Sequence, residues 1–167
     1  MPRPVASVIG AGETATDADC ANAFRVGQLL AEAGWAVVNG GRDFGVMRHV
    51  NRGVRAAGGM AVGIVSSADR PVCPEADVVV VTEMHNARNN IVVLSGQVVI
   101  ACGDGGPGTV SEIALAVKAG KPVILLGANE LSQAFFGRLG GDQVTFATTA
   151  EEAVAMANAI RSRRPGD

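Results

Sequence analysis

The sequence predicts an α/β protein built on a doubly wound, mostly parallel sheet of about seven strands, with helices on both faces. Short runs rich in β-branched residues alternate with longer helical segments, which is the pattern of parallel strands joined by crossover helices. Several of these runs are continuously apolar, as in strands covered on both faces. The 167 residues fall within the size range of one domain. We therefore expect residues 1–167 to form a single domain.

Seven strands and five helices are expected along the chain. The strands are predicted at residues 5–10, 35–39, 60–65, 77–82, 97–102, 122–126 and 143–147. The helices are predicted at residues 17–33, 44–57, 84–95, 109–119 and 149–163. Thr16 or Asp17 is the expected N-cap of the first helix, and Gly34 follows its end. Residues 126–141 are predicted as a loop with a short helical turn near residues 133–138.

Two segments carry a specific expectation about burial. The four valines at 78–81 are continuously apolar, which predicts a central strand with helices on both faces. In the helix over 44–57, the apolar residues recur at helical spacing on one side. The other side carries polar residues, which we interpret as a solvated face rather than a binding patch. These polar residues are Arg48, Asn51, Arg52 and Arg55.

Composition excludes several classes of function. The net charge is −2 and aromatic residues make up 4% of the chain, so a basic field and stacking surfaces for nucleic-acid bases are both missing. No apolar run approaches the roughly 20 residues that span a bilayer, and the apolar stretch that stops at Gly10 is too short for a signal peptide. We expect a cytoplasmic protein that binds neither nucleic acid nor membrane.

The three cysteines give no metal or disulfide pattern. Cys20, Cys73 and Cys102 are widely separated and odd in number, and none belongs to a CxxC pair. We interpret them as small buried residues. The sequence therefore assigns no metal site.

Three glycine clusters follow predicted strands. In an open parallel sheet, ligands bind beyond the carboxyl ends of the strands, where the strand order reverses. The clusters therefore mark candidate ligand-binding loops. They are Gly10-Ala11-Gly12, Gly40-Gly41-Arg42-Asp43-Phe44-Gly45 and Gly103-Asp104-Gly105-Gly106-Pro107-Gly108-Thr109.

The first cluster fits the dinucleotide pattern G-x-G-x-x-A, but its acidic partner is missing. The second strand ends in Asn39-Gly40-Gly41-Arg42, which offers no Asp or Glu to hold a ribose hydroxyl group. We therefore expect no NAD. A tight turn beside another ligand explains these glycines better.

The third cluster predicts a phosphate cradle of a different kind from a nucleotide-triphosphatase P-loop. The Lys that would precede Thr109 in a P-loop is missing. Glycines let backbone N–H groups approach a phosphate, Pro107 stiffens the turn, and Thr109 is expected to open a helix whose positive end faces the ligand. Glu112 lies one turn further; it either serves the ligand or completes a capping box with Thr109.

Arg88 is a second candidate for anion binding. It follows the fourth predicted strand, at the same sheet edge as the glycine clusters. An Arg at that edge can hold a phosphate or a carboxylate by two parallel hydrogen bonds. A surface Arg without a partner is the alternative interpretation.

These segments together resemble the lysine decarboxylase-like superfamily. Residues 40–47, 87–91 and 105–112 carry the resemblance, and the last match the superfamily's GGxGTxxE signature at every fixed position. The superfamily includes the Lonely Guy phosphoribohydrolases, which release cytokinin bases from riboside monophosphates, and the molybdenum-cofactor carrier proteins. The resemblance implies a Rossmann-like fold and a homodimer or homotetramer.

Three departures favour the carrier branch. Asp104, Asn89 and Ile113 replace the Pro, Lys and second Glu that are usual in the phosphoribohydrolases. The chain thus resembles proteins that bind and protect molybdenum cofactor without turning it over, with molybdoenzymes as possible acceptors. The cofactor's phosphate would lie on residues 105–109, with Arg42 and Arg88 as cationic contacts.

Two alternatives stay open. One is a hydrolase that acts on nucleoside 5′-monophosphates. Arg88 and Glu112 would then be catalytic, because a carboxylate can stabilise an oxocarbenium-like ribosyl centre. The other alternative is a nucleotide sensor without catalytic activity. Under the carrier interpretation no residue is catalytic. The expected ligand-binding residues are Gly10, Ala11, Gly12, Gly40, Gly41, Arg42, Gly45, Val46, Met47, Arg88, Asn89, Gly105, Gly106, Pro107, Gly108, Thr109 and Glu112.

We also expect the oligomer to be built on the helices at 84–95 and 109–119. Residues 91–94 and 113–117 are apolar around most of each helix, more than one sheet-facing side requires. A second copy related by twofold symmetry would cover the remainder.

Overall fold

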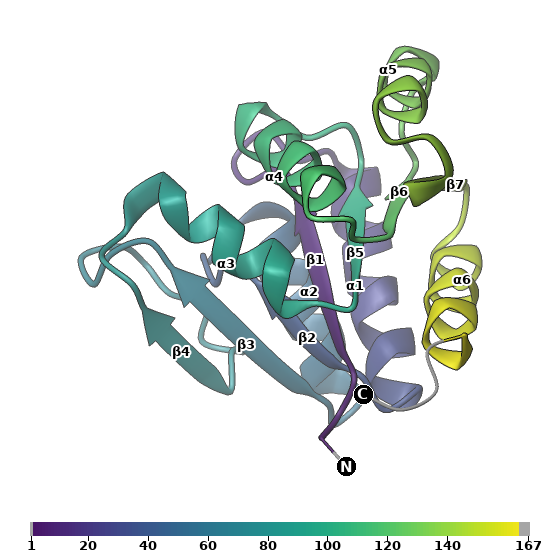
Figure 1. Ribbon diagram of the computed structural model, residues 1–167. Helices are drawn as coiled ribbons and strands as arrows, with labels where there is room; N and C mark the ends of the chain where they lie inside the picture. Colours follow the sequence, from purple (N-terminus) through teal and green to yellow (C-terminus); the bar gives the residue numbers. More distant parts are fainter. Residues whose placement is uncertain (1, 164–167) are drawn as a thin grey trace.

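The computed structural model describes residues 2–163 and shows one sheet of seven parallel strands (Figure 1). The strand order is β4-β3-β2-β1-β5-β6-β7. All seven predicted strands are present, and each boundary agrees with the prediction to within one residue. The strands are β1 (Val5–Gly10), β2 (Ala36–Asn39), β3 (Met60–Val65), β4 (Val78–Val81), β5 (Val98–Cys102), β6 (Val123–Leu126) and β7 (Val144–Ala147).

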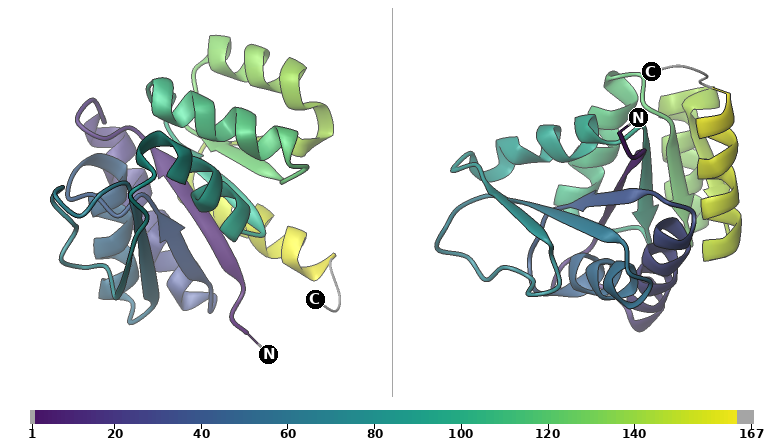
Figure 2. Two further views of the ribbon diagram at one scale, coloured as in Figure 1. Left: turned by 60° about the vertical axis from the view of Figure 1, so that its left-hand side comes forward. Right: turned by 90° about the horizontal axis from the view of Figure 1, so that it is seen from below.

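Within residues 2–163, six α-helices cover the two faces of the sheet (Figure 2). α1, α2 and α6 pack on one face, and α3, α4 and α5 on the other. The predicted doubly wound α/β class is therefore confirmed. The helices are α1 (Asp17–Glu32), α2 (Gly45–Ala56), α3 (Arg88–Ser95), α4 (Pro107–Lys118), α5 (Glu130–Gly140) and α6 (Ala150–Ser162), with short 3₁₀ turns at His85–Ala87 and Gly141–Gln143.

The central strands are buried on both faces, as their uniform apolar sequence predicts. Every residue of β2, β5 and β6 is buried. On the α1 side, Trp35 is fully buried and its indole N–H donates to Asn158 Oδ1 at 2.9 Å, which ties the start of β2 to α6. At the start of α1, Thr16 is the N-cap and forms a capping box with Asp19.

The prediction that β4 is a central strand is wrong. β4 lies at the edge of the sheet, beside β3, and its four valines are 40–49% exposed. After β4 the chain returns through α3, which packs over β1, β2 and β3, so both faces of β4 stay open. The apolar run thus predicted a strand correctly. Whether that strand is covered by helices depends on where the next helix packs, which the run itself does not indicate.

The prediction of a loop over residues 126–141 is also wrong, because this segment contains the 11-residue helix α5. Asn129 caps its start, accepting a hydrogen bond from the Ser132 N–H group. Phe136 is the buried residue of this helix, whereas Leu131 is 82% and Phe135 59% exposed. A helix that buries so little of its apolar surface has no clear periodic pattern, which explains the wrong prediction.

Candidate ligand-binding site

The glycine-rich loops after β1, β2 and β5 meet at the carboxyl edge of the sheet. The strand order runs outward from β1 in both directions, with β2 to β4 on one side and β5 to β7 on the other. The reversal therefore lies between β1 and β5, where open α/β sheets bind ligands. A cavity of about 380 Å³ occupies this position, a volume within the range of small-molecule sites.

Most of the predicted site residues line this cavity. From the prediction these are Gly10, Ala11, Gly12, Gly40, Arg42, Met47, Arg88, Asn89, Gly106, Pro107, Gly108, Thr109 and Glu112. The structure therefore brings together the three loops and Arg88, which are far apart in the sequence.

Four predicted residues do not line the cavity. Val46 is fully buried and packs against Gly10, so it belongs to the core. Gly41 lies in the turn after β2. Gly45 and Gly105 have φ of 56° and 68°, in the left-handed region that favours glycine, so they shape the loops.

The cavity also includes residues that the sequence analysis missed. Phe44 comes from the second glycine loop, and Arg70 from the segment between β3 and β4. Asn86 precedes α3, and Val8, Ile9, Glu13 and Thr14 flank the first glycine cluster. The neighbouring glycines gave a signal for Phe44, whereas the sequence around Arg70 has no periodic pattern.

The N-terminus of α4 opens onto the cavity. This helix begins at Pro107 with Gly106 as N-cap, two residues earlier than predicted. No side chain within residues 2–163 caps it, so the first-turn N–H groups that lack intrahelical partners remain for an anion. The capping box of Thr109 with Glu112 is therefore wrong: both residues lie inside the helix and are buried.

Two arginines with buried Nε atoms also line the cavity. The Nε atoms of Arg42 and Arg88 are inaccessible to solvent and have no hydrogen-bond partner in the described part of the chain. The Arg42 guanidinium lies 4.5 Å from the centre of the Phe44 ring, which holds it by a cation–π contact. Burying a polar group without a partner is unfavourable, so these two side chains are suited to an anionic ligand.

Arg88 and Glu112 form a loose, buried ion pair. Their side chains are 12% and 9% exposed, and Arg88 Nη1 lies 3.7 Å from Glu112 Oε1, longer than a charge-assisted hydrogen bond. Burial lowers the pKa of Arg88; Glu112 opposes this, and the charge of Arg42 lowers it further. Burial raises the pKa of Glu112 to about 7, although Arg88 acts in the opposite direction. Because the two side chains are too far apart to share a short hydrogen bond, each can still form hydrogen bonds with a ligand.

A buried amide pair holds the loop after β2. Asn39 accepts a hydrogen bond from the Gly41 N–H group at 2.8 Å and donates to Asn51 Oδ1 at 2.6 Å. Asn51 was predicted on the solvated face of α2, and this prediction is wrong because Asn51 is fully buried. The need to partner Asn39 explains a polar side chain in the core.

Asp104, Asn89 and Ile113, the three residues that differ from the phosphoribohydrolase pattern, each have a structural role. Asp104 accepts hydrogen bonds from the backbone and side chain of Asn129, at 2.9 and 2.8 Å. Asn89 donates to Ser111 Oγ at 3.1 Å, which joins α3 to α4. Ile113 lies in the core cluster beneath α4. None of the three adds an ionised group to the cavity lining.

Comparisons with known proteins agree with this fold. The molybdenum cofactor binding protein of Rippkaea orientalis is 46% identical, with a TM-score of 0.93 over 96% of this chain and 99% of that one. The molybdenum cofactor carrier protein of Chlamydomonas reinhardtii is 34% identical, with a TM-score of 0.91 over 96% and 99%. An uncharacterized protein of Archaeoglobus fulgidus is 43% identical over 120 residues, 71% of this chain and 77% of that protein.

Two further findings concern the chain as a whole. Within residues 2–163, no helix is both long and apolar enough to cross a membrane. The model of the SLOG cluster4 family matches residues 3–155, and this match is consistent with the lysine decarboxylase-like superfamily. With most of its length matched, the chain belongs to the SLOG cluster4 family.

Proposed function

We propose that this protein is a single-domain carrier that binds molybdenum cofactor in the cavity between β1 and β5 and does not turn it over. The observation that carries the proposal is the pair of buried, unpartnered Nε atoms of Arg42 and Arg88 beside the open N-terminus of α4. Relatives matched over nearly their whole length are described as binding or carrying this cofactor. Both findings support a phosphorylated pterin as the ligand.

The phosphate group is assigned to the start of α4. A Cβ atom built on Gly106 or Gly108 meets no atom within 4 Å, so both backbones border open space. The unpaired N–H groups and the positive end of the helix dipole favour an anion there. Arg42 and Arg88 would add charge-assisted hydrogen bonds to phosphate or other acceptor atoms of the cofactor.

The absence of turnover is part of the proposal. A hydrolase acting on nucleoside monophosphates would use Arg88 and Glu112 as catalytic residues. Asp104, Asn89 and Ile113 stand where the phosphoribohydrolases usually carry Pro, Lys and a second Glu, and none of the three adds an ionised group to the cavity lining. We therefore assign both residues to binding.

The test combines binding with an activity assay. Protein purified from its own host is analysed by native mass spectrometry, and the loaded protein is tested for transfer of cofactor to a cofactor-free nitrate reductase. We expect a retained pterin mass and protected reconstituting activity. In parallel, incubation with AMP and cytokinin riboside monophosphates should release no free base. Base release at ordinary enzyme rates that is lost in Glu112→Gln would overturn the carrier function.

We further propose that the protein forms a homodimer or homotetramer through α3 and α4. Leu94 on α3 and Val110 on α4 are exposed, and a hollow over the two helices is lined in part by Ala114 and Leu115. Covering these side chains would favour association. Light scattering at micromolar concentration should give a multiple of 16.9 kDa, and Val110→Glu should shift it toward the monomer. A parent protein of 16.9 kDa alone would refute this.

Cytoplasmic location and transfer to molybdoenzymes complete the proposal. All three cysteines are free thiols, which suits a reducing compartment.

A further inference from the structure

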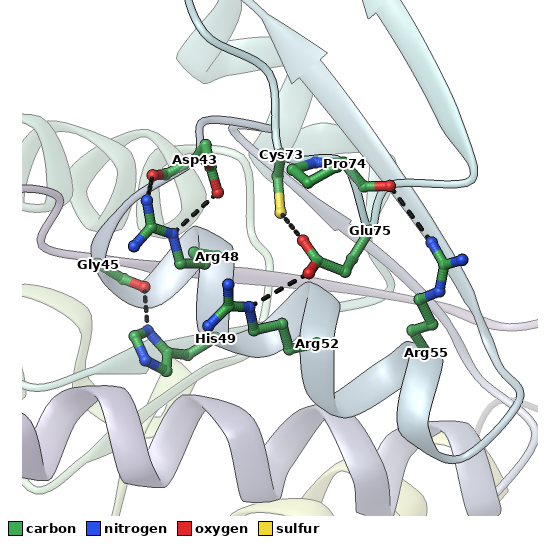
Figure 3. A network of polar contacts seen from close by, with 9 residues as sticks. All are labelled: Asp43, Gly45, Arg48, His49, Arg52, Arg55, Cys73, Pro74 and Glu75. Atoms are coloured by element: carbon green, nitrogen blue, oxygen red, sulfur yellow. Dashed lines mark hydrogen bonds and ion pairs between the residues drawn. The ribbon is translucent and has the colours of Figure 1, made fainter.

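A cluster of potential metal ligands lies beside the cavity, at residues that do not line it. Asp43, Cys73 and Glu75 each offer one ligand atom, and these atoms lie within 4.8 Å of one another (Figure 3). Cys73 is 1% exposed, and its Sγ lies 3.1 Å from Glu75 Oε2. Asp43 and Glu75 are half-buried. A thiol and two carboxylates thus lie close together in a partly buried position.

The backbone already holds these residues together. Asp43 belongs to the loop after β2, whereas Cys73 and Glu75 belong to the segment between β3 and β4. The Cys73 N–H group donates to the Gly41 carbonyl at 2.9 Å, and Arg42 forms an isolated antiparallel bridge with Val72. The three side chains therefore converge without needing an ion to bring the two segments together.

An independent feature points to a ligand at the sulfur. Asn51 is fully buried, and its Nδ2 atom has no hydrogen-bond partner in the described part of the chain, although its Oδ1 is used by Asn39. The Asn51 side chain lies close enough to the Cys73 sulfur to act on the thiol. A buried N–H group beside the sulfur could therefore support a metal-bound thiolate, as hydrogen-bonding groups around metal ligands do.

The arginines around the cluster leave ligand atoms available. Arg48 Nε contacts Asp43 Oδ1 at 2.8 Å, and Arg52 Nε contacts Glu75 Oε1 at 3.3 Å (Figure 3). Each ion pair engages one oxygen of its carboxylate. Three anionic ligands around a divalent ion would leave one excess negative charge, so with the two arginines the occupied cluster would carry one net positive charge. The same arginines balance the two carboxylates while the thiol is protonated, so the cluster is also stable without a metal.

The geometry points to a binding site for a divalent metal ion, best suited to Zn²⁺, at Asp43, Cys73 and Glu75, with water as the fourth ligand. One sulfur and two oxygens suit this borderline-soft ion. Bonds of about 2.3 Å to sulfur and about 2.1 Å to oxygen at a tetrahedral angle bring ligand atoms to about 3.6 Å from one another, so modest side-chain rotations close the cluster. The Cys73 thiol proton passes to solvent as the metal–sulfur bond forms.

Cobalt is the probe, because a cobalt–thiolate bond gives a charge-transfer absorption band in the near ultraviolet. The full chain is treated with a chelator, dialysed and titrated with Co²⁺. We expect one equivalent to produce the band, Zn²⁺ to displace it, and about one proton to be released per ion in weakly buffered solution. Cys73→Ser should abolish the band, whereas Cys20→Ser, which changes a thiol outside the cluster, should retain it.

Two further variants separate ligation from folding. Glu75→Gln should weaken Zn²⁺ binding, and Asn51→Ala should weaken it by about tenfold or more, the effect of removing a group that supports a metal ligand. Fluorescence of Trp35 confirms that each variant is folded. A parent protein without the band, or a band that Cys73→Ser retains, would overturn the site.

Discussion

Replacing Glu112 by Gln should stabilise the ligand-free protein at alkaline pH. Glu112 is buried on α4, and Arg88 Nη1 lies 3.7 Å from its carboxylate. Burial is the main reason that its pKa rises to about 7, and the attraction of Arg88 only reduces that rise. The ionised carboxylate is therefore less stable in the folded chain than in the unfolded chain. Gln has nearly the same shape and no charge.

The sign and size of the effect follow from proton linkage. The folded-state pKa of about 7 lies above the ordinary value of 4.5, so between these values the folded chain holds a proton that the unfolded chain has lost. The free energy of unfolding of the parent therefore falls as pH rises from about 4.5 to about 7. At about 1.4 kcal/mol for each pH unit, the loss is about 3 kcal/mol. The Gln variant has no such loss.

The assay is urea unfolding followed by the fluorescence of Trp35, the single Trp and a fully buried one. Parent and Glu112→Gln should have similar free energies of unfolding at pH 4.5, and the variant should be more stable by about 3 kcal/mol at pH 8. Glu151→Gln is the matched control, because the hydrogen bond from Arg25 lowers the pKa of that exposed carboxylate; it should give no gain. A Glu112→Gln variant less stable than the parent at pH 8 would show that the ion pair with Arg88 is net stabilising, and would refute the reasoning.

Three other changes test the cavity. Gly106→Asp should abolish the rise in melting temperature that cofactor produces, because the new carboxylate would repel the ligand's phosphate at the N-terminus of α4. The control Ala155→Asp adds the same charge on α6, away from the cavity, and should keep this rise. Arg88→Lys should weaken cofactor binding by about tenfold in a calorimetric titration, because one of two parallel hydrogen bonds is lost. Asn39→Ala should lower the free energy of unfolding by about 1–3 kcal/mol in urea, because the buried Gly41 N–H group loses its acceptor.

The sequence predicted much of the cavity lining because each loop there carries its own local signal. Gly106, Pro107 and Gly108 form a phosphate-binding pattern at a strand end, and the topology of a doubly wound sheet brings such ends together. Arg70 and Asn86 could not be found this way. They come from irregular segments, and their place at the cavity depends on how those segments cross the sheet edge.

Two of the errors, at β4 and at Asn51, share one physical cause: burial is decided by neighbours that are distant in sequence. The valines of β4 satisfy every local rule for a central strand, but no helix covers them. Asn51 satisfies the rule for an exposed helix face, but the Asn39 amide requires a buried partner. Hydrophobic patterning describes one element at a time, so it predicts that an element exists more reliably than what lies against it.

The loop after β2 joins the cavity to the polar cluster beneath it. Arg42 and Phe44 line the cavity, whereas the side chain between them, Asp43, contacts Arg48 on α2 (Figure 3). The two neighbours of Asp43 thus face the cavity, while Asp43 itself is held by α2. We therefore expect a change at Asp43 to act on a ligand through the position of Arg42, without contact to that ligand. Weakened cofactor binding in an Asp43 variant would therefore show that the loop after β2 must be held in place. Weakened binding in a variant of Arg88, which comes from α3, would instead show the loss of a direct contact with the ligand.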